Sequence, residues 1–334
     1  MLDSQTYLNV CQVALVRDLI IIKENITEFK KYYSKLNFFI ICPSKEIESF
    51  LKIKDNNIKI INEESIISFE DFKKIFLNNL KTTSYFQEIQ SRLNWYYQQV
   101  LKISFIIDFI KNNNERIIIW DSDTVILKKI DFFGKDFSIK YATINEFFKA
   151  YYLTNKTIFG YLPNFFLSSL LQFVSLTKLE NEFLIKNLNN FKIKENLTTA
   201  EWISNIISLA IFKTHKNYNG SMFSEYELIG ISNIFLTNNR QKIIPTLRNN
   251  LNGKLTELQK TIARIIGFYH ITYEHSHQNV NSFGMLLRNQ SWGSYFKILA
   301  KNLLKFLPYL FFYHILRLFY YLKQKKNKIN YIYK

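Results

Sequence analysis

One apolar run, residues 116–127, constrains the fold of this chain more than any other stretch. It reads RIIIWDSDTVIL. β-Branched residues followed by Trp are typical of a strand that is buried on both faces, as in a parallel sheet. Such strands present functional groups at their carboxyl ends, where open α/β sheets bind ligands. The run therefore predicts an α/β fold with Asp121 and Asp123 at the ligand-binding edge of the sheet.

These two aspartates have two interpretations. A strand-ending turn in which Asp121 caps backbone amides would explain such a pair taken alone. Two hard oxygen donors also suit a divalent cation such as Mg²⁺ or Mn²⁺, with positions left for phosphate oxygens. The apolar stretches on both sides favour the second interpretation. We therefore predict Asp121 and Asp123 as metal ligands, and Ser122 between them as a contact to the bound nucleotide.

The first 130 residues alternate between apolar runs and amphipathic segments. Strands are predicted over residues 8–16, 37–42 and 57–61, and a long helix over about 87–110. This alternation indicates a doubly wound, mostly parallel sheet. Arg17 and Asp18 follow the first strand and are expected to meet the nucleotide at the same sheet edge as the aspartate pair.

The long helix carries a second group of candidate side chains. Gln98, Gln99 and Lys102 occupy one to two turns and are expected to contact the sugar or the phosphates. A solvent-exposed helix face is the alternative, but two adjacent glutamines beside two aromatic residues are not typical of such a face. Trp95 is expected in the core.

The second half of the chain gives weaker patterns. Residues 141–145 are a possible strand, 147–191 are predicted mostly helical, and the TTAE sequence at 198–201 predicts a capped helix to about residue 213. Ser224-Glu225-Tyr226-Glu227 predicts another capped helix start. Glu225 is the preferred general base, because the helix amino terminus would hold its carboxylate ionised. Glu227 is a second catalytic candidate, with a structural capping role as the alternative.

A third metal ligand is expected late in the chain. Three of the five histidines and Glu274 cluster within residues 270–277. In an extended segment His275 and His277 share one face, and we predict that one of them completes the metal site. An ordinary structural imidazole is the alternative for each.

Composition excludes several classes of protein. The chain has 334 residues, 48% of them hydrophobic, so a large core is expected. Its 8 glycines form no Gly-rich phosphate loop, so phosphate binding would depend on metal and basic side chains. Cys11 and Cys42 lie in apolar runs and are expected as buried free thiols, which fits a cytoplasmic location. The amino terminus lacks the pattern of a signal peptide.

Charge is concentrated at the carboxyl end. The formal net charge is +17, and residues 275–334 contain ten basic residues and no acidic one. Residues 295–334 also contain twelve aromatic residues. No run reaches the roughly 20 apolar residues of a membrane span, so the pattern favours a peripheral anchor on the anionic inner-membrane surface. A helix packed on the catalytic domain is the alternative.

Three ordered motifs carry a family resemblance. WYYQQVLK at 95–102, DSDTV at 121–125 and SEYEL at 224–228, with Arg17-Asp18 before them, resemble the DUF6492 type of bacterial protein. The aspartate pair also resembles the metal-binding motif of GT-A glycosyltransferases. The resemblance covers roughly residues 8–280 and implies a GT-A-like catalytic domain, which we predict over residues 1–290. It also implies sugar transfer in capsule or lipopolysaccharide assembly. The charge and aromatic content predict a basic, aromatic helical tail over 291–334.

The resulting expectation is a Mn²⁺- or Mg²⁺-dependent glycosyltransferase. It would transfer a sugar from a UDP-, GDP- or CMP-linked donor to a glycan or glycolipid acceptor. A metal-dependent phosphosugar or polyol-phosphate transferase is the second enzyme hypothesis. A nucleic-acid-binding protein is the non-enzyme hypothesis, but the charge lies mainly in the tail and no RNA-binding or helix-turn-helix pattern is present.

Overall fold

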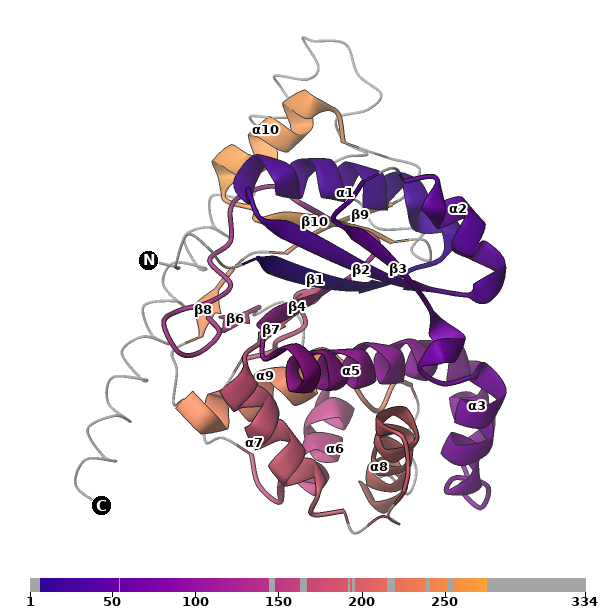
Figure 1. Ribbon diagram of the computed structural model, residues 1–334. Helices are drawn as coiled ribbons and strands as arrows, with labels where there is room; N and C mark the ends of the chain where they lie inside the picture. The colour runs from indigo at the N-terminus through magenta and orange to yellow at the C-terminus, as the bar shows by residue number, and fades with distance from the viewer. Residues whose placement is uncertain are drawn as a thin grey trace, which may run out of the picture.

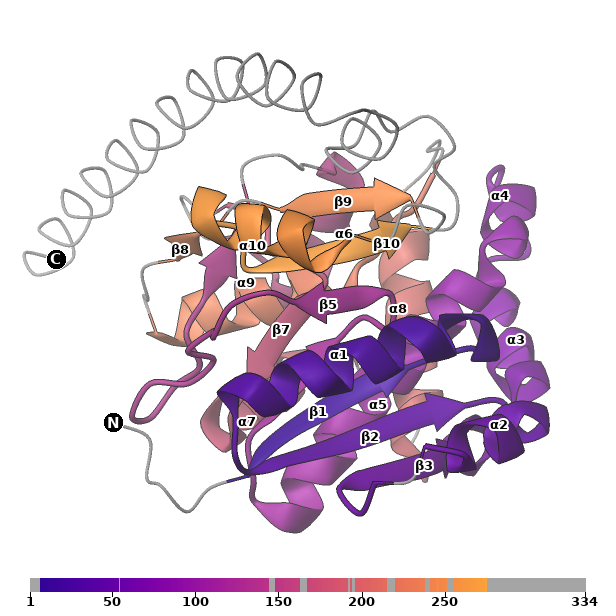
Figure 2. The same cartoon turned by 90° about the horizontal axis from the view of Figure 1, so that it is seen from above.

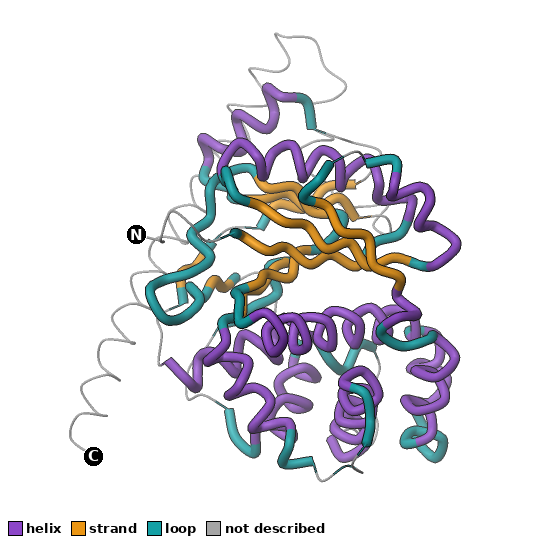
Figure 3. Tube along the Cα trace, viewed as in Figure 1, coloured by secondary structure: helices purple, strands orange, loops and turns teal. Residues whose placement is uncertain are grey.

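A five-stranded sheet forms the centre of the molecule (Figures 1 and 3). The computed structural model describes residues 7–53, 55–143, 148–162, 167–191, 193, 196–214, 220–237, 241–244, 246–250 and 255–274. The strand order is β3-β2-β1-β4-β7. The strands are β1 (Leu8–Val13), β2 (Leu36–Cys42), β3 (Ile58–Asn62), β4 (Ile117–Trp120) and β7 (Phe173–Leu176). β3, β2, β1 and β4 are mutually parallel, and β7 pairs antiparallel with β4. The expected α/β class and mostly parallel sheet are confirmed.

Helices cover the sheet unequally on its two faces (Figure 1). One face carries α1 (Leu19–Tyr32), and α2 (Ile47–Leu51) lies at its edge. The other face carries α5 (Leu93–Asn113), which contacts β1 and β4. Beyond α5 lie α3 (Phe69–Asn78), α6 (Lys149–Phe159), α7 (Lys178–Leu188), α8 (Thr199–Thr214) and α9 (Glu225–Thr237). The sheet is thus thinly covered on one side and thickly on the other.

Two smaller sheets complete the strands. β5 (Thr124–Ile126) follows β4 directly and pairs antiparallel with β10 (His270–Glu274), which pairs parallel with β9 (Leu247–Asn250). Figure 2 shows α10 (Glu257–Ile266) running beside these strands. β6 (Tyr141–Ala142) pairs with β8 (Lys242–Ile243).

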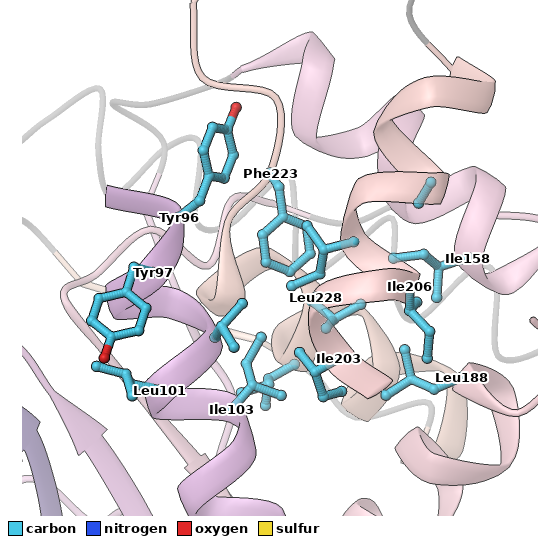
Figure 4. Packing of buried hydrophobic residues seen from close by; sticks show 14 of the residues in the cluster. Tyr96, Tyr97, Leu101, Ile103, Ile158, Leu188, Ile203, Ile206, Phe223 and Leu228 are labelled. Atoms are coloured by element: carbon cyan, nitrogen blue, oxygen red, sulfur yellow. The ribbon is translucent and has the colours of Figure 1, made fainter. Parts of the chain in front are cut away.

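Burial of aromatic and branched side chains holds these layers together. Figure 4 shows Tyr96, Tyr97 and Leu101 of α5 in the same cluster as Ile203 and Ile206 of α8. A second cluster fills the space under α1. Each fully buried aliphatic or aromatic side chain contributes about 1.5–3 kcal/mol. The large cluster therefore fixes the position of α5 on the sheet.

The strand that carries the aspartates is fixed by its tryptophan. Trp120 is fully buried. Its ring lies 4.9 Å from Phe29 of α1, edge to face, and 5.2 Å from Phe173 of β7, stacked. The indole is thus held between the helix above the sheet and the neighbouring strand. This packing fixes the position of the end of β4, from which Asp121 and Asp123 follow.

Most predicted elements are present, with shifted ends. The long helix predicted over 87–110 is divided at Arg92 into α4 (Phe86–Ser91) and α5. The TTAE cap is confirmed, because Thr198 and Glu201 exchange side chain to backbone hydrogen bonds. Cys11 and Cys42 are buried free thiols, as expected. The mostly helical prediction for 147–191 was wrong over residues 173–176, because strand β7 lies there and pairs with β4.

The tail lies outside the described residues, as does everything after residue 274. Among the helices that the structure describes, none combines the length and the apolar character needed to cross a membrane.

Candidate functional site

A cleft of about 340 Å³ opens where the carboxyl ends of β1 and β4 meet. The chain leaves β1 toward β2 on one side, and β4 joins β1 on the other. This is the topological switch point at which open α/β sheets bind ligands. The cleft is lined by Val13, Arg17, Asp18, Trp95, Gln98, Gln99, Lys102, Asp121, Ser122, Asp123, Phe148, Tyr151, Leu170, Gln172, Ser224, Glu225 and Tyr226.

The aspartate pair lies in a tight turn at the end of β4. The Thr124 N–H donates to the Asp121 carbonyl at 3.1 Å, which closes the turn. The Trp120 indole N–H donates to the Thr124 carbonyl at 2.8 Å. The two hydrogen bonds fix the backbone that presents the carboxyl groups. The backbone thus forms the strand-ending turn of the first interpretation. The Asp121 and Asp123 side chains nevertheless line the cleft.

Lys102 of α5 joins three residues of the site. Its ammonium donates to Asp121 Oδ1 at 2.5 Å and to Glu225 Oε1 at 2.7 Å, and lies 3.2 Å from the Tyr226 hydroxyl. The Tyr226 hydroxyl in turn donates to Asp121 Oδ1 at 2.5 Å. Burial alone lowers the pKa of Lys102, but attraction to Asp121 and Glu225 outweighs it and holds that pKa above its ordinary value. Lys102 is therefore a permanent positive charge beside Asp121.

Negative groups nonetheless outnumber positive ones in the cleft. Four carboxyl groups line it, from Asp18, Asp121, Asp123 and Glu225, against the two cations of Arg17 and Lys102. Burial raises the pKa of Asp123 to about 8, and the nearby Asp121 and Asp18 carboxylates act in the same direction. Asp123 therefore keeps a proton at neutral pH while no cation is bound, and a divalent cation beside Asp121 and Asp123 would favour the ionised form.

Asp18 connects the end of β1 to the aspartate turn. Its Oδ2 accepts a hydrogen bond from Ser122 Oγ at 3.0 Å. Arg17 lies beside it, with Nε 3.9 Å from Asp18 Oδ1, and 59% of its side chain is exposed. The structure thus brings Arg17 and Asp18 next to the Asp121–Asp123 turn, although 104 positions separate Asp18 from Ser122.

The candidates on α5 have different surroundings. Gln99 is buried and its Oε1 accepts a hydrogen bond from the Glu225 N–H at 3.1 Å, so it caps the start of α9. Gln98 is half-buried and lines the cleft. The expectation that Trp95 belongs to the core holds in part. Its ring packs on the large cluster, but it is only half-buried and also lines the cleft.

The two glutamates of α9 lie in separate places. Glu225 is buried, lines the cleft and pairs with Lys102. Burial raises the pKa of Glu225, and Lys102 opposes that rise. Glu227 does not line the cleft and is fully buried. Its Oε1 accepts hydrogen bonds from Ser168 Oγ at 2.6 Å and from the Tyr152 hydroxyl at 3.1 Å. This environment suits a structural carboxylate better than a catalytic one.

The donor set fits a divalent cation held by few protein ligands. Within the described ranges, no three or more His, Cys, Asp or Glu side chains are grouped so that they could hold a metal ion. Carboxylate oxygens of Asp121 and Asp123 are the hard donors that Mg²⁺ or Mn²⁺ prefers. Such a cation would offset the excess of carboxyl groups, and it would keep several positions for phosphate oxygens or water.

The predicted histidine ligands, His275 and His277, lie outside the described residues. The strand that leads to them is described. β10 runs antiparallel to β5, and the Tyr273 N–H donates to the Asp123 carbonyl at 2.8 Å. The described chain therefore reaches Glu274, its last residue, next to the aspartate turn.

Tyr226, Phe148, Tyr151 and Gln172 are among the cleft-lining residues that the sequence did not identify. Tyr226 lies between the two glutamates that were considered, and no pattern distinguished it from a core tyrosine. Phe148 and Tyr151 lie in an aromatic stretch that predicted only helix. Gln172 has a left-handed backbone with φ 60°, and its carbonyl accepts the Asp121 N–H at 2.9 Å. Such a conformation costs a non-glycine residue about 1–3 kcal/mol, and no sequence signal marks it here.

Together, the fold and the cleft define an α/β protein with an acidic cleft at its switch point. A model of a family of unknown function, DUF6492, matches residues 15–161. No curated protein matches the sequence.

Several solved glycosyltransferase structures show a weak likeness. The galactosyltransferase LgtC, with donor and acceptor sugar analogues, has 8% identity and a TM-score of 0.40, over 88% of this chain and 96% of that one. Mouse xyloside xylosyltransferase 1 has 10% identity and a TM-score of 0.38, over 82% and 99%. GlyE of Streptococcus pneumoniae TIGR4 has 10% identity and a TM-score of 0.27, over 61% and 44%. Similarity this low assigns no activity to the chain.

Proposed function

We propose that the chain is a metal-dependent glycosyltransferase that uses a nucleotide-sugar donor. The observation that carries the proposal is the acidic cleft at the carboxyl ends of β1 and β4, where Asp121 and Asp123 lie beside Asp18. A diphosphate leaving group needs positive charge near its oxygens. A site with excess carboxyl groups binds a diphosphate only together with a cation. The metal-dependent transferase is the chemistry that this donor set supports best.

The roles follow from the position of each side chain. Asp121 and Asp123 would hold a Mn²⁺ or Mg²⁺ ion, which would act as a Lewis acid toward the leaving diphosphate. Lys102 orients Asp121 through its 2.5 Å hydrogen bond and places a fixed positive charge at the same oxygen. Arg17, exposed at the mouth of the cleft, is positioned to meet a phosphate or the nucleoside. One of His275 and His277 remains the proposed third ligand.

Glu225 is the proposed general base for the acceptor hydroxyl. It lines the cleft, and its burial disfavours the ionised form enough to make it a better proton acceptor than an exposed glutamate. Lys102 opposes that rise in pKa, since its ammonium lies 2.7 Å from Glu225 Oε1. The acceptor class, a capsule or lipopolysaccharide glycan, comes from the family resemblance in the sequence.

A thermal-shift screen of UDP-, GDP- and CMP-sugars, with and without Mn²⁺, tests this function. A ligand at 100 times its dissociation constant stabilises the native state by about 2.7 kcal/mol. We expect one donor class to raise the melting temperature only when Mn²⁺ is present. No shift with any nucleotide-sugar, or equal shifts with and without the metal, would contradict the proposal.

The tail is proposed as an interfacial anchor on the cytoplasmic side of the inner membrane. Ten basic and no acidic residues in 275–334 would attract anionic lipid, and the interleaved aromatic residues would insert at the acyl boundary. Apolar insertion is insensitive to salt, whereas binding to nucleic acid weakens steeply as salt rises. We expect the full chain to stay partly bound to anionic vesicles in high salt. Complete release, with tight RNA binding at moderate salt, would instead support the nucleic-acid hypothesis.

A further inference from the structure

Three aromatic side chains form one side of the cleft, and the proposed chemistry uses none of them. They are Trp95 from the first turn of α5, Phe148 at the amino-terminal cap of α6 and Tyr151 in the first turn of α6. The rings of Trp95 and Tyr151 are stacked, with centroids 6.3 Å apart and planes 20° apart. The Phe148 and Tyr151 centroids lie 5.2 Å apart. We call these three residues the aromatic wall.

The aromatic wall lies at a fixed distance from the charged groups. Trp95, Gln98 and Lys102 are spaced i, i+3 and i+7 on α5, so they share one face of the helix, and all three line the cleft. Seven residues of helix rise about 10 Å. Along α5 the cleft is thus lined by the Lys102 ammonium, then by the Gln98 amide and then by the Trp95 indole. The positions of Lys102 and Trp95 are about 10 Å apart along the helix axis, roughly the length of two sugar rings.

Phe148 is the exposed member of the aromatic wall. It is 48% exposed, whereas Tyr151, whose ring it contacts, is 6% exposed. Trp95 and Phe148 each pack against Tyr151, and all three residues line the cleft. A preorganised aromatic surface of this kind binds a ligand without the cost of ordering its own side chains.

We propose that the aromatic wall, with Gln98 beside it, is the acceptor subsite and takes a neutral pyranose ring through its apolar C–H face. This inference rests on the proposed glycosyltransferase function. A pyranose has a face of C–H groups and a rim of hydroxyls. The negative face of an aromatic ring attracts the partly positive C–H groups, and the Gln98 amide offers a donor and an acceptor to the hydroxyl rim.

The nucleobase of the donor is the competing occupant. The switch-point geometry places a nucleotide at the carboxyl end of β1, next to Val13, Arg17 and Asp18, with its phosphates toward the aspartate turn. The aromatic wall comes from α5 and α6 instead, beyond Lys102. A donor that occupies the β1 side leaves the wall for the second sugar.

Two matched variants of the full chain test the assignment. Phe148→Ala removes the most exposed ring of the wall. Phe212→Ala removes a phenylalanine of similar exposure, 44%, on α8 and outside the cleft. For wild type and both variants, two quantities are measured. The first is the affinity for UDP and GDP with Mn²⁺. The second is the affinity for methyl glycosides of glucose, galactose and N-acetylglucosamine, from saturation-transfer NMR titrations that also show which sugar protons contact the protein.

We expect at least one methyl glycoside to contact wild type and Phe212→Ala through the protons of one ring face. An aromatic contact of about 0.5–1.5 kcal/mol corresponds to about a 2- to 12-fold loss of sugar affinity in Phe148→Ala. Nucleotide affinity should stay unchanged in that variant. Weaker nucleotide binding in Phe148→Ala would assign the wall to the base, and equal sugar contact or no contact in wild type would also overturn the inference. Failure of wild type to bind either nucleotide with Mn²⁺ would instead refute the proposed function.

Discussion

Lys140 and Lys102 are both buried lysines paired with carboxylates, but their electrostatic surroundings differ. Lys140 pairs with Glu180 alone, in a site where both residues are buried and neither lines the cleft. Burial lowers the pKa of Lys140 to about 8, and Glu180 only partly opposes that shift. Lys102 pairs with both Asp121 and Glu225, and the attraction raises its pKa.

This difference in surroundings distinguishes the structural ion pair at Lys140 from the proposed cation site beside Lys102. At Lys140 one positive and one negative group balance, and Ser138 also donates to Glu180. At Lys102 the carboxyl groups remain in excess after every cation of the cleft is counted. Burial of charge is common to both places, so burial alone does not indicate function. An excess of carboxyl groups over cations beside an open cleft does.

The largest expected effect is on turnover and concerns Glu225. As a general base it should contribute about 10²- to 10⁴-fold in rate and little in donor affinity. Glu225→Gln should therefore lose turnover by that factor, while calorimetry shows donor binding within about twofold of wild type. Near-normal turnover in this variant would remove Glu225 from the base role.

The next effect is on stability and concerns the balanced pair. Lys140→Met leaves Glu180 buried without its cation, which should lower the free energy of unfolding by about 3–5 kcal/mol. Denaturant unfolding measures the loss. Addition of Mn²⁺ should not restore it, because Glu180 is fully buried and does not line the cleft. Recovery with Mn²⁺ would show that the two lysine sites are not electrostatically distinct.

Lys102→Met should respond to Mn²⁺, unlike Lys140→Met. It removes the cation between Asp121 and Glu225 and leaves the buried Glu225 carboxyl group without its partner, so the loss of stability should be about 3–5 kcal/mol. Mn²⁺ should raise the melting temperature more in this variant than in wild type, since the bound ion replaces part of the missing charge. An equal or smaller Mn²⁺ effect would contradict a cation site next to Asp121.

The smallest effect should come from Glu227. Glu227→Gln keeps the size of the side chain but weakens the hydrogen bonds from Ser168 and Tyr152. We expect a loss of about 1–3 kcal/mol in stability with donor affinity unchanged. A variant that is stable but catalytically dead would reverse the assignments of Glu225 and Glu227.

Sequence reasoning succeeded where local patterns and the sheet determine position. The apolar run before Asp121 and the Arg17-Asp18 pair after the first strand follow from strand ends that meet at one edge. It failed where tertiary contacts decide. Residues 173–176 look helical alone and become a strand because β4 offers an open edge. Nothing in the motif around Glu225 predicts that Lys102, 123 positions away, would pair with it.

The carboxyl groups of the cleft are proposed to bind a cation that in turn binds a nucleotide diphosphate. Isothermal titration of UDP and GDP, with and without Mn²⁺, tests this proposal in wild type, Asp123→Ala and the exposed control Asp136→Ala. We expect Mn²⁺-dependent binding in wild type and control, and a loss of at least about 100-fold in Asp123→Ala, since outer-shell changes alone cost about 10- to 100-fold. Unchanged affinity in Asp123→Ala with an intact fold would contradict it.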